Sequence, residues 1–206
     1  MASEFRHLWS LDPDVDFLNH GSFGATPIPV LDAQAAIRRR MEAEPVAFLS
    51  RDLEGLLDDA RVYLGAFLGA DPDDLAFVDN ATTGLNAVLR WLPLTAGDEL
   101  LTTDHEYNAC RNAMEAVAAP LGARVVTVAI PFPIPGPEDV VERVLAAVTP
   151  RTRLAVLDHV TSATALVLPI EELVAELTAR GVDTLVDGAH APGMLDVNLN
   201  QLGAAY

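Results

Sequence analysis

The 206-residue chain contains no lysine, and its 13 basic residues are all arginine. Alanine, arginine, valine and proline are abundant, so codon bias accounts for the absence in the simplest way. Whatever its origin, chemistry that needs a lysine amine cannot be performed by this chain alone. A Walker-type nucleotide loop requires a lysine and is therefore excluded.

Positive charge and cysteine are also scarce. The arginines face 30 acidic residues, and the net charge of −17 argues against nucleic acid or an anionic membrane as the main partner. The single cysteine, Cys110, excludes an internal disulfide framework and suits a reducing compartment. No apolar run reaches transmembrane length and the start lacks a signal-peptide pattern, so we expect a soluble, cytoplasmic protein.

The chain as a whole is 50% hydrophobic, which is the composition of a globular protein. Apolar residues repeat at helical spacing over 28–44 and 47–69, and strands then alternate with helices to the end of the chain. The expected strands are 76–79, 99–104, 124–130, 153–160 and 183–187, with another beginning within 202–206. The expected helices between them are 81–92, 107–119, 137–148 and 170–180.

The expected strands are continuous apolar runs, which is typical of strands covered on both faces. Repeated strand–helix units predict an α/β fold with a mostly parallel sheet, helices on both faces and ligands at the carboxyl ends of the strands. We expect an N-terminal segment, 1–27, followed by a large α/β domain, 28–206. Because the chain stops as a strand begins, we expect this domain to be truncated.

Polar residues follow the first strand in the stretch D-N-A-T-T-G, 79–84. Backbone N–H groups at the start of the next helix, with the hydroxyls of Thr82 and Thr83 beside them, could cradle a phosphate group. The alternative is that Asn80 or Thr82 simply caps the helix.

Two further strand ends carry polar groups. The stretch 104–109, D-H-E-Y-N-A, brings Tyr107 to the rim of the sheet, where its ring could stack on a planar ligand or merely pack against a helix start. The stretch 158–164, D-H-V-T-S-A-T, offers the hydroxyls of Thr161 and Ser162, or is simply a polar loop.

The last expected strand ends in Asp187, with His190 three residues on. A buried ionised carboxylate is costly unless something compensates it, and nothing cationic lies nearby in the sequence. The alternative is an aspartate that caps a turn. Taken together, the four strand ends describe a site for a planar phosphorylated cation, and pyridoxal phosphate (PLP) fits that description. Asp187 would keep the pyridine nitrogen protonated, and the ring would serve as an electron sink.

Five motifs carry a resemblance to a known family. They are F-L-N-H-G-S-F-G (17–24), N-A-T-T-G-L-N (80–86), H-E-Y-N-A (105–109), D-H-V-T-S-A-T (158–164) and V-D-G-A-H-A-P-G (186–193). In this order the chain resembles class V aminotransferases, and within them it is most similar to the isopenicillin N epimerase-like branch, which is related to cysteine desulfurases. The resemblance implies the large domain of the PLP-dependent transferase fold of type I.

The resemblance also implies roles for individual residues. The phosphate would be bound by Ala81 and Thr82, next to the hydroxyl of Thr83 in the cradle described above. The ring would be contacted by Tyr107 through stacking, by Thr161 or Ser162 together with His190 at the ring hydroxyl, and by Asp187 at the ring nitrogen. The loop beside the substrate would be formed by Asn19, His20, Gly21 and Ser22.

One element of the family is missing from the sequence. A Schiff-base lysine follows a G-A-A-Y-type strand in the family, and this chain ends at 203–206, G-A-A-Y. The resemblance therefore implies the N-terminal half of a PLP-dependent enzyme, without its C-terminal small domain. The intact enzyme would be a homodimer acting at the α-carbon or Cβ of an amino-acid substrate, as an epimerase, lyase or aminotransferase.

Two other interpretations stay open at this point. Three Asp–His pairs at neighbouring strand ends could hold zinc or iron in a hydrolase: Asp104 with His105, Asp158 with His159, and Asp187 with His190. Against a metal, no H-x-x-x-H pattern occurs and a metal would not need the threonines. The chain could also be a non-catalytic pseudoenzyme or scaffold, which becomes the better interpretation if 206 residues is its natural length. Cys110 falls on an apolar helix, where a buried thiol is expected.

Overall fold

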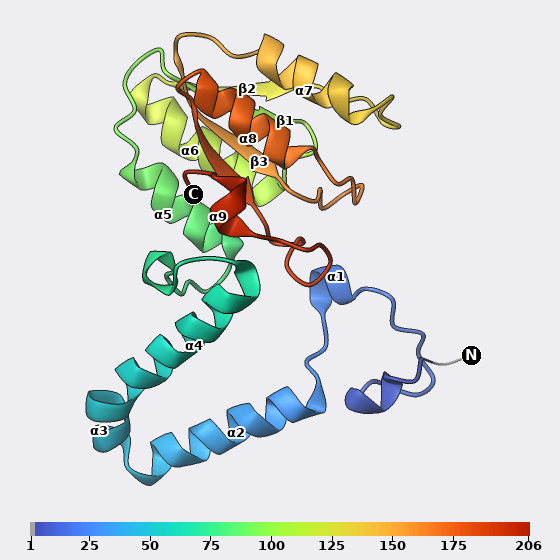
Figure 1. Ribbon diagram of the computed structural model, residues 1–206, viewed down its shortest axis with the longest axis vertical. Helices are drawn as coiled ribbons and strands as arrows, with labels where there is room; N and C mark the ends of the chain where they lie inside the picture. The colour runs from blue at the N-terminus through green and yellow to red at the C-terminus, as the bar shows by residue number, and fades with distance from the viewer. Residues whose placement is uncertain (1–2) are drawn as a thin grey trace. The chain divides into compact units, whose positions relative to one another are not determined.

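A computed structural model describes residues 3–206 of the chain (Figure 1). The chain divides into two compact units, one ending at Arg61 and the other spanning Val62–Tyr206, and each is described by itself. This division differs from the expected boundary at 27/28, which stays a prediction about the domains of the whole protein. None of the helices in the described range is long and apolar enough to cross a lipid bilayer.

The first unit is helical. Helix α2, Ile28–Ala43, begins after Pro27 and carries a proline in its first turn, where the missing N–H costs nothing. The single helix expected over 47–69 is interrupted by a π-helical turn, so it forms as three consecutive pieces. The elements of this unit are η1 (Arg6–Leu8), α1 (His20–Phe23), α2, α3 (Pro45–Ala47), η2 (Phe48–Asp52) and the first part of α4 (Leu53–Leu68), which continues into the second unit.

The second unit contains a four-stranded sheet in the order β2-β1-β3-β4, and every pair of neighbours is parallel. The strands are β1 (Glu99–Thr103), β2 (Arg124–Val128), β3 (Thr152–Asp158) and β4 (Asp183–Asp187). The helical elements of this unit after α4 are η3 (Pro72–Asp74), α5 (Ala81–Trp91), α6 (Asn108–Leu121), α7 (Pro137–Ala146), α8 (Ile170–Ala179) and α9 (Leu199–Leu202). The expected parallel α/β fold is confirmed.

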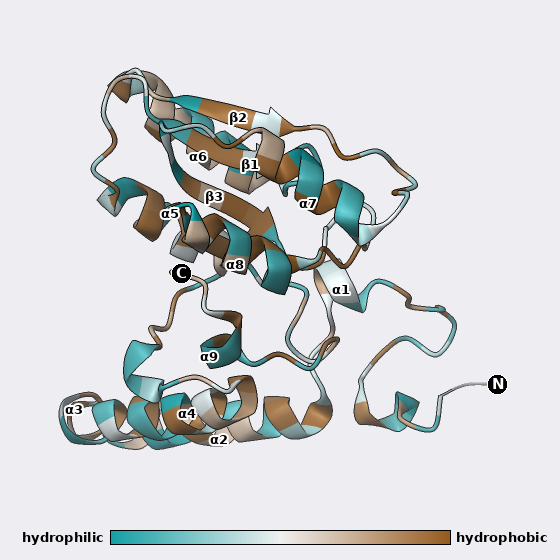
Figure 2. Cartoon of the chain, turned by 45° about the horizontal axis from the view of Figure 1, so that its top comes forward, coloured by the Kyte–Doolittle hydropathy of each residue, from teal (hydrophilic) through white to brown (hydrophobic). Residues whose placement is uncertain are grey.

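Helices cover both faces of the sheet. On one face, buried residues of α7 and α8 pack with Leu101, Ala155 and Leu157 of the strands. On the other face, α5 and α6 pack with Leu100 and Leu154 and their neighbours. In Figure 2 the hydrophobic colour accordingly runs along most of β2 and β3. These two apolar layers explain why the strands appear in the sequence as unbroken apolar runs.

Alternation along the strands decides which polar residues share the α5/α6 face at the carboxyl edge. Leu154 and Val156 of β3 face α5 and α6, so Asp158, two residues on, points to the same side. Leu185 of β4 also faces α5 and α6, and Asp187, two residues on, points to the same side. Asp158 and Asp187 are paired in register across β3 and β4. The two aspartates are therefore neighbours on one face of the sheet.

The strand expected at 76–79 does not form. Residues 75–78 join no ladder, and Phe77 and Val78 are about half exposed. A strand needs a partner edge. At the β4 edge of the sheet, Tyr206 is already bound: its N–H donates to the Thr184 carbonyl at 3.0 Å, and its carbonyl accepts from the Val186 N–H at 2.9 Å. These bonds agree with a further parallel strand starting near 206.

Glu99, at the amino end of β1, shows how this fold compensates a buried carboxylate. Its side chain is fully buried and accepts a hydrogen bond from Thr149 Oγ1 at 2.6 Å. Arg124 Nη2 lies 2.5 Å from Oε1, and Arg151 Nε lies 3.5 Å from the same oxygen. The Thr149 hydroxyl and the two arginines hold the pKa of Glu99 below its ordinary value despite its burial.

Candidate functional site

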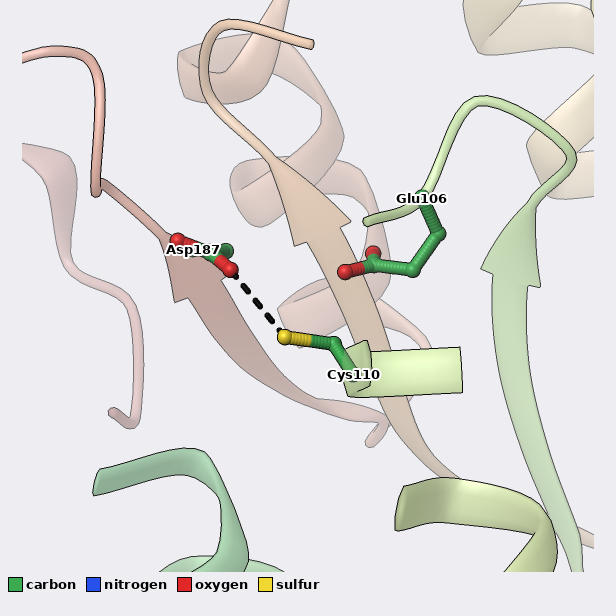
Figure 3. A group of neighbouring side chains, drawn as sticks. All are labelled: Glu106, Cys110 and Asp187. Carbon is green, nitrogen blue, oxygen red and sulfur yellow. Dashed lines mark hydrogen bonds between the residues drawn. The ribbon is translucent and has the colours of Figure 1, made fainter. Parts of the chain in front are cut away.

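The carboxyl ends of β3 and β4 meet the loop after β1 and the first turn of α6, and there Asp187 lies beside Glu106 and Cys110 (Figure 3). One carboxylate oxygen from each acid and the Cys110 sulfur all lie within 4.8 Å of one another. Asp158 completes the group from β3. We call Glu106, Asp158 and Asp187 the acid cluster.

Asp187 accepts hydrogen bonds at both of its carboxylate oxygens. The backbone N–H of Ala189 donates to Oδ1 at 3.0 Å, and this bond is the turn cap that was the alternative to a functional role. The Cys110 thiol donates to Oδ2 at 3.4 Å. The side chain is 8% exposed. The turn cap therefore uses only one of the two oxygens. It does not by itself prevent the carboxylate from binding a ligand.

Cys110 is fully buried in α6, as the sequence predicts. Burial, followed by the charges of Asp187 and Glu106, raises the pKa of its thiol well above the ordinary range. The thiol therefore keeps its proton and acts as a donor to Asp187. A thiol held in this state is neither a nucleophile nor a good metal ligand.

Glu106 and Asp158 are buried and only partly compensated. Burial first, and then the charges of Asp158 and Asp187, raise the pKa of Glu106 to about 8. Burial and the charge of Asp187 raise the pKa of Asp158 to about 7. Thr102 donates a hydrogen bond to Glu106 Oε2 at 3.1 Å, but Glu106 Oε1 and Asp158 Oδ2 have no partner within the described chain.

The first turn of α5 has donors to offer beside this cluster. Asn80 caps the helix, because its Oδ1 accepts from the N–H of Thr83 at 2.9 Å, and the Thr83 hydroxyl also reaches it at 3.1 Å. The N–H groups of Ala81 and Thr82 have no acceptor inside the helix, since helices begin with free donors. The Thr82 side chain also influences the pKa of Cys110, which places this turn next to the acid cluster.

A hydrogen-bond chain ties together the loops after three strands. The N–H of Leu166 donates to Thr161 Oγ1 at 2.9 Å, and this hydroxyl lies 2.7 Å from that of Thr164. Thr164 Oγ1 is 2.9 Å from His105 Nδ1, and His105 Nε2 is 2.9 Å from the Ile130 carbonyl. In the neutral ring, Nε2–H must donate to the carbonyl, so Thr164 donates to Nδ1 and Thr161 donates to Thr164. With that ring form, the hydroxyl proton of Thr161 is already used.

The other predicted ring contacts differ in how accessible they are. Tyr107, at the start of α6, is 47% exposed, so its ring is available at the rim. Ser162 is exposed and His190 is half-buried in the turn after β4. Thr161 is only 1% exposed. Of the two hydroxyl residues that the sequence left as alternatives, Ser162 is the free one, and the cofactor roles of all these residues stay predictions.

The predicted substrate loop lies in the first unit. Asn19 caps α1 through a hydrogen bond from the Ser22 N–H to its Oδ1 at 3.3 Å. The His20 ring contacts the Phe17 ring edge-on, with centroids 4.8 Å apart. Gly21 has open space around it. The role of this loop beside the substrate is not tested by the geometry of its own unit and stays a prediction.

The alternative of a metal-dependent hydrolase is not supported. Within residues 3–206, the three Asp–His pairs do not converge: the group of ligand-type side chains that comes together contains no histidine. His159 follows Asp158 on the strand and lines a different cavity of about 640 Å³, together with Val186 and Tyr206. Alternation at the end of β3 sends Asp158 and His159 to opposite sides, so these two residues do not converge on one site.

Comparison with known proteins identifies the family. Residues 24–206 match the family model described as aminotransferase class V. The chain belongs to the class V aminotransferases. It is 46% identical over 204 residues to the isopenicillin N epimerase of Amycolatopsis lactamdurans, covering 98% of this chain and 51% of that protein. It is 33% identical to a probable chloroplastic L-cysteine desulfhydrase of Arabidopsis thaliana, covering 100% of this chain and 46% of that protein.

A solved structure agrees with this class V aminotransferase assignment. A mutant of C-DES with glycine covalently linked to its PLP cofactor superposes with a TM-score of 0.86 at 26% identity. The alignment covers 97% of this chain and 53% of C-DES. The chain thus spans about half the length of the relatives it matches. The resemblance inferred from the five motifs, including its isopenicillin N epimerase-like character, is confirmed.

Sequence reasoning missed the acid cluster. Glu106 and Asp158 stand within motifs that were recognised, but Glu106 was given no role and Asp158 only that of a metal ligand. Glu106 and Cys110 are about 80 residues from Asp187 in the sequence, so no local pattern joins them. The available signal was an acidic residue at the end of each of two apolar strands that finish at the same edge of the sheet.

Proposed function

We propose that the whole protein containing this chain is a PLP-dependent enzyme that acts at the α-carbon or Cβ of an amino-acid substrate. The observation that carries the proposal is Asp187, a buried carboxylate at the carboxyl end of a parallel strand with no cationic partner within residues 3–206. C-DES, whose solved structure has the same fold, carries PLP. The pyridinium nitrogen of PLP is the positive charge that Asp187 lacks.

The residues at this edge fit the group in three further ways. The free N–H groups of Ala81 and Thr82 at the start of α5 suit a phosphate, with the helix dipole adding to the attraction. The exposed ring of Tyr107 can lie against the face of a planar ligand. Ser162 is free to reach a ring hydroxyl. Together these side chains would orient the cofactor between a phosphate anchor and a carboxylate.

When bound, PLP supplies an electron sink for a substrate carbanion. The part of Asp187 is to hold a proton on the ring nitrogen, because an ionised carboxylate stabilises the adjacent positive charge. Its two hydrogen bonds, from Ala189 and Cys110, fix the direction in which the carboxylate points. Epimerisation and lyase chemistry both need this sink, and relatives of the chain carry the names of an epimerase and of desulfhydrases.

Replacement of Thr82 by alanine tests the phosphate site. Loss of a hydroxyl hydrogen bond to a charged group corresponds to about 1.5–3 kcal/mol, so the dissociation constant of PLP should rise roughly tenfold to a hundredfold. The measurement is a titration of the cofactor-free whole protein with PLP, followed by absorbance near the visible edge. Turnover at saturating PLP should change much less than affinity.

Thr178→Ala serves as the matched control, because this exposed threonine lies on α8, on the other face of the sheet. It should bind PLP like the wild type. If Thr82→Ala also bound like the wild type, the phosphate would not lie at the start of α5. A whole protein that binds no PLP at all would favour the scaffold interpretation instead.

We also propose that the whole protein is a homodimer, as its family resemblance implies. The part of α4 in the second unit exposes large apolar side chains, with Val62 at 55%, Tyr63 at 79% and Phe67 at 64%. A run of this kind on one helix is typical of a buried contact in an assembly. A second copy of the protein would remove it from water.

The variant Phe67→Glu should weaken the dimer at least tenfold, because it would bury a charge without a partner. Sedimentation velocity over a range of protein concentrations gives the dissociation constant. Ala175→Glu, on the exposed face of α8, is the control and should leave the dimer unchanged. A wild-type protein that sediments as a monomer at micromolar concentration would contradict the proposal.

A further inference from the structure

The acid cluster places three carboxyl groups in one buried place. Glu106, Asp158 and Asp187 are 5%, 3% and 8% exposed. Oxygens of Glu106 and Asp187 approach within 4.8 Å (Figure 3). Asp158 is the in-register neighbour of Asp187 on β3. Three full negative charges at this spacing would repel one another strongly, because burial removes the screening by water.

Within the described residues, 3–206, no positive side chain forms an ion pair with these acids. Glu99, a deeply buried acid outside the cluster, has Arg124 and Arg151 beside it. All the ion pairs formed within residues 3–206 involve carboxylates outside the cluster. Proton uptake is then the remaining way to lower the charge of the cluster.

Hydrogen bonding shows which carboxyl groups are suited to hold a proton. Both oxygens of Asp187 accept bonds, from Ala189 N–H and from the Cys110 thiol. Glu106 and Asp158 each leave one oxygen buried without a partner. A buried carboxylate oxygen without a partner loses its hydration and gains no hydrogen bond in return. The carboxyl group is therefore more stable in its neutral, protonated form. The raised pKa values of Glu106 and Asp158 agree with this division.

We propose that Glu106 and Asp158 form a proton-holding acid pair that acts through Asp187. In the cofactor-free protein at neutral pH, the pair keeps at least one proton beside Asp187. When a cationic ring binds at Asp187, the pair releases a proton to solvent, and the carboxylate it gains offsets the new positive charge. Proton retention in the cofactor-free protein is the first step of this proposal and does not depend on the proposed function. Proton release on binding of the cationic ring is the second step, and it rests on the proposed function.

The groups that face the pair agree with this behaviour. Asp187 faces it from β4, and the Cys110 thiol, which stays protonated, faces Asp187 from α6. Thr102 of β1 donates to Glu106, and this bond opposes the effect of burial. The charges acting on the pair from its neighbours are therefore negative. Glu106 and Asp158 are positioning residues, since they set the charge around Asp187 rather than contact the reacting atoms.

Infrared spectroscopy of the cofactor-free whole protein tests the first step. Exposed carboxyl groups are ionised by pH 6, so a carboxylic-acid carbonyl band that persists there reports a buried acid. We expect such a band in the wild type, lost with a midpoint between about pH 7 and 8. The double variant Glu106→Gln/Asp158→Asn should lack it, and Glu115→Gln, an exposed change on α6, should keep it.

The pH dependence of folding stability gives a second readout, which can be measured first on the wild type. An acid whose pKa is raised by folding keeps its proton in the folded state while the unfolded chain releases it, so stability falls as pH rises. The midpoint of urea unfolding of the cofactor-free protein should decrease from about pH 4.3 up to the pKa values of the pair and level off above them. The double variant should show a smaller decrease.

Addition of PLP tests the second step. At pH 6.5 the acid band of the wild type should decrease when PLP binds, and Glu115→Gln should behave in the same way. Absence of the band in the cofactor-free wild type, or its survival in the double variant, would overturn the acid pair. A band that stays unchanged while PLP binds would overturn the release step. A protein that shows the band and the pH-dependent stability but binds no PLP would support the pair and refute the proposed function.

Discussion

Replacement of Asp187 by asparagine is expected to lower turnover of the whole protein about a thousandfold or more. That loss corresponds to roughly 4 kcal/mol of transition-state stabilisation. An amide has nearly the shape of the carboxylate and can still accept the hydrogen bond from Ala189, so folding should be preserved. It cannot hold a proton on the pyridine nitrogen, and the neutral ring is a weaker electron sink. The measurement is kcat at saturating PLP and substrate.

Asp183→Asn is the matched control for this substitution. Asp183 is exposed at the opposite end of the same strand, β4, and far from the acid cluster along the sheet. Its replacement should leave turnover unchanged. PLP should still bind to Asp187→Asn, because the phosphate anchor at the start of α5 is intact. Nearly normal turnover in Asp187→Asn would mean that the residue only caps its turn.

Leu157→Ala is expected to cost about 3 kcal/mol of folding stability, within the range for leucine-to-alanine changes in close-packed cores. Leu157 is fully buried on β3, in the apolar layer between the sheet and helices α7 and α8. Removal of its side chain leaves a cavity that surrounding strands and helices can fill only in part. Urea unfolding of the whole protein, monitored by circular dichroism, gives the change in midpoint.

The same substitution at Leu121, 45% exposed near the end of α6, is the control and should cost less than about 1 kcal/mol. Leu157 points away from the α5/α6 face, so Leu157→Ala should retain turnover at temperatures where it stays folded. A large loss of turnover in the folded variant would show that the two faces of the sheet are more tightly coupled than their separate apolar layers indicate.

Local patterns predicted most of the fold because each element depends mainly on its own residues. The run D-T-L-V-D, 183–187, forms β4 with the expected bounds, and helices 137–148 and 170–180 differ from α7 and α8 by only one or two residues at their ends. The strand expected at 76–79 failed for a different reason. Its residues suit an extended conformation, but a strand also requires a neighbour to pair with, and that is a non-local condition.

In the candidate site, too, the sequence predicted what depends on local residues and missed what depends on contacts between distant ones. The sequence indicated Asp187 because a carboxylate directly after a buried strand must lie at the ligand-binding edge of a parallel sheet. It also indicated the start of α5, where free N–H groups follow from helix geometry alone. It could not show that Thr161 is engaged with Thr164 and His105, since those partners come from different loops.

The sequence by itself determined the fold class, the family and the strand end that carries Asp187, because periodicity, motif order and the lack of lysine are all read along the chain. Only the tertiary structure decided that Glu106 and Asp158 face Asp187, with no cationic side chain from the described part of the chain paired with them. The physical reason is that the charge state of a buried carboxyl group depends on what packs around it. Here, those neighbours come from β1, β3, β4 and α6, which are up to about 80 residues apart in the sequence.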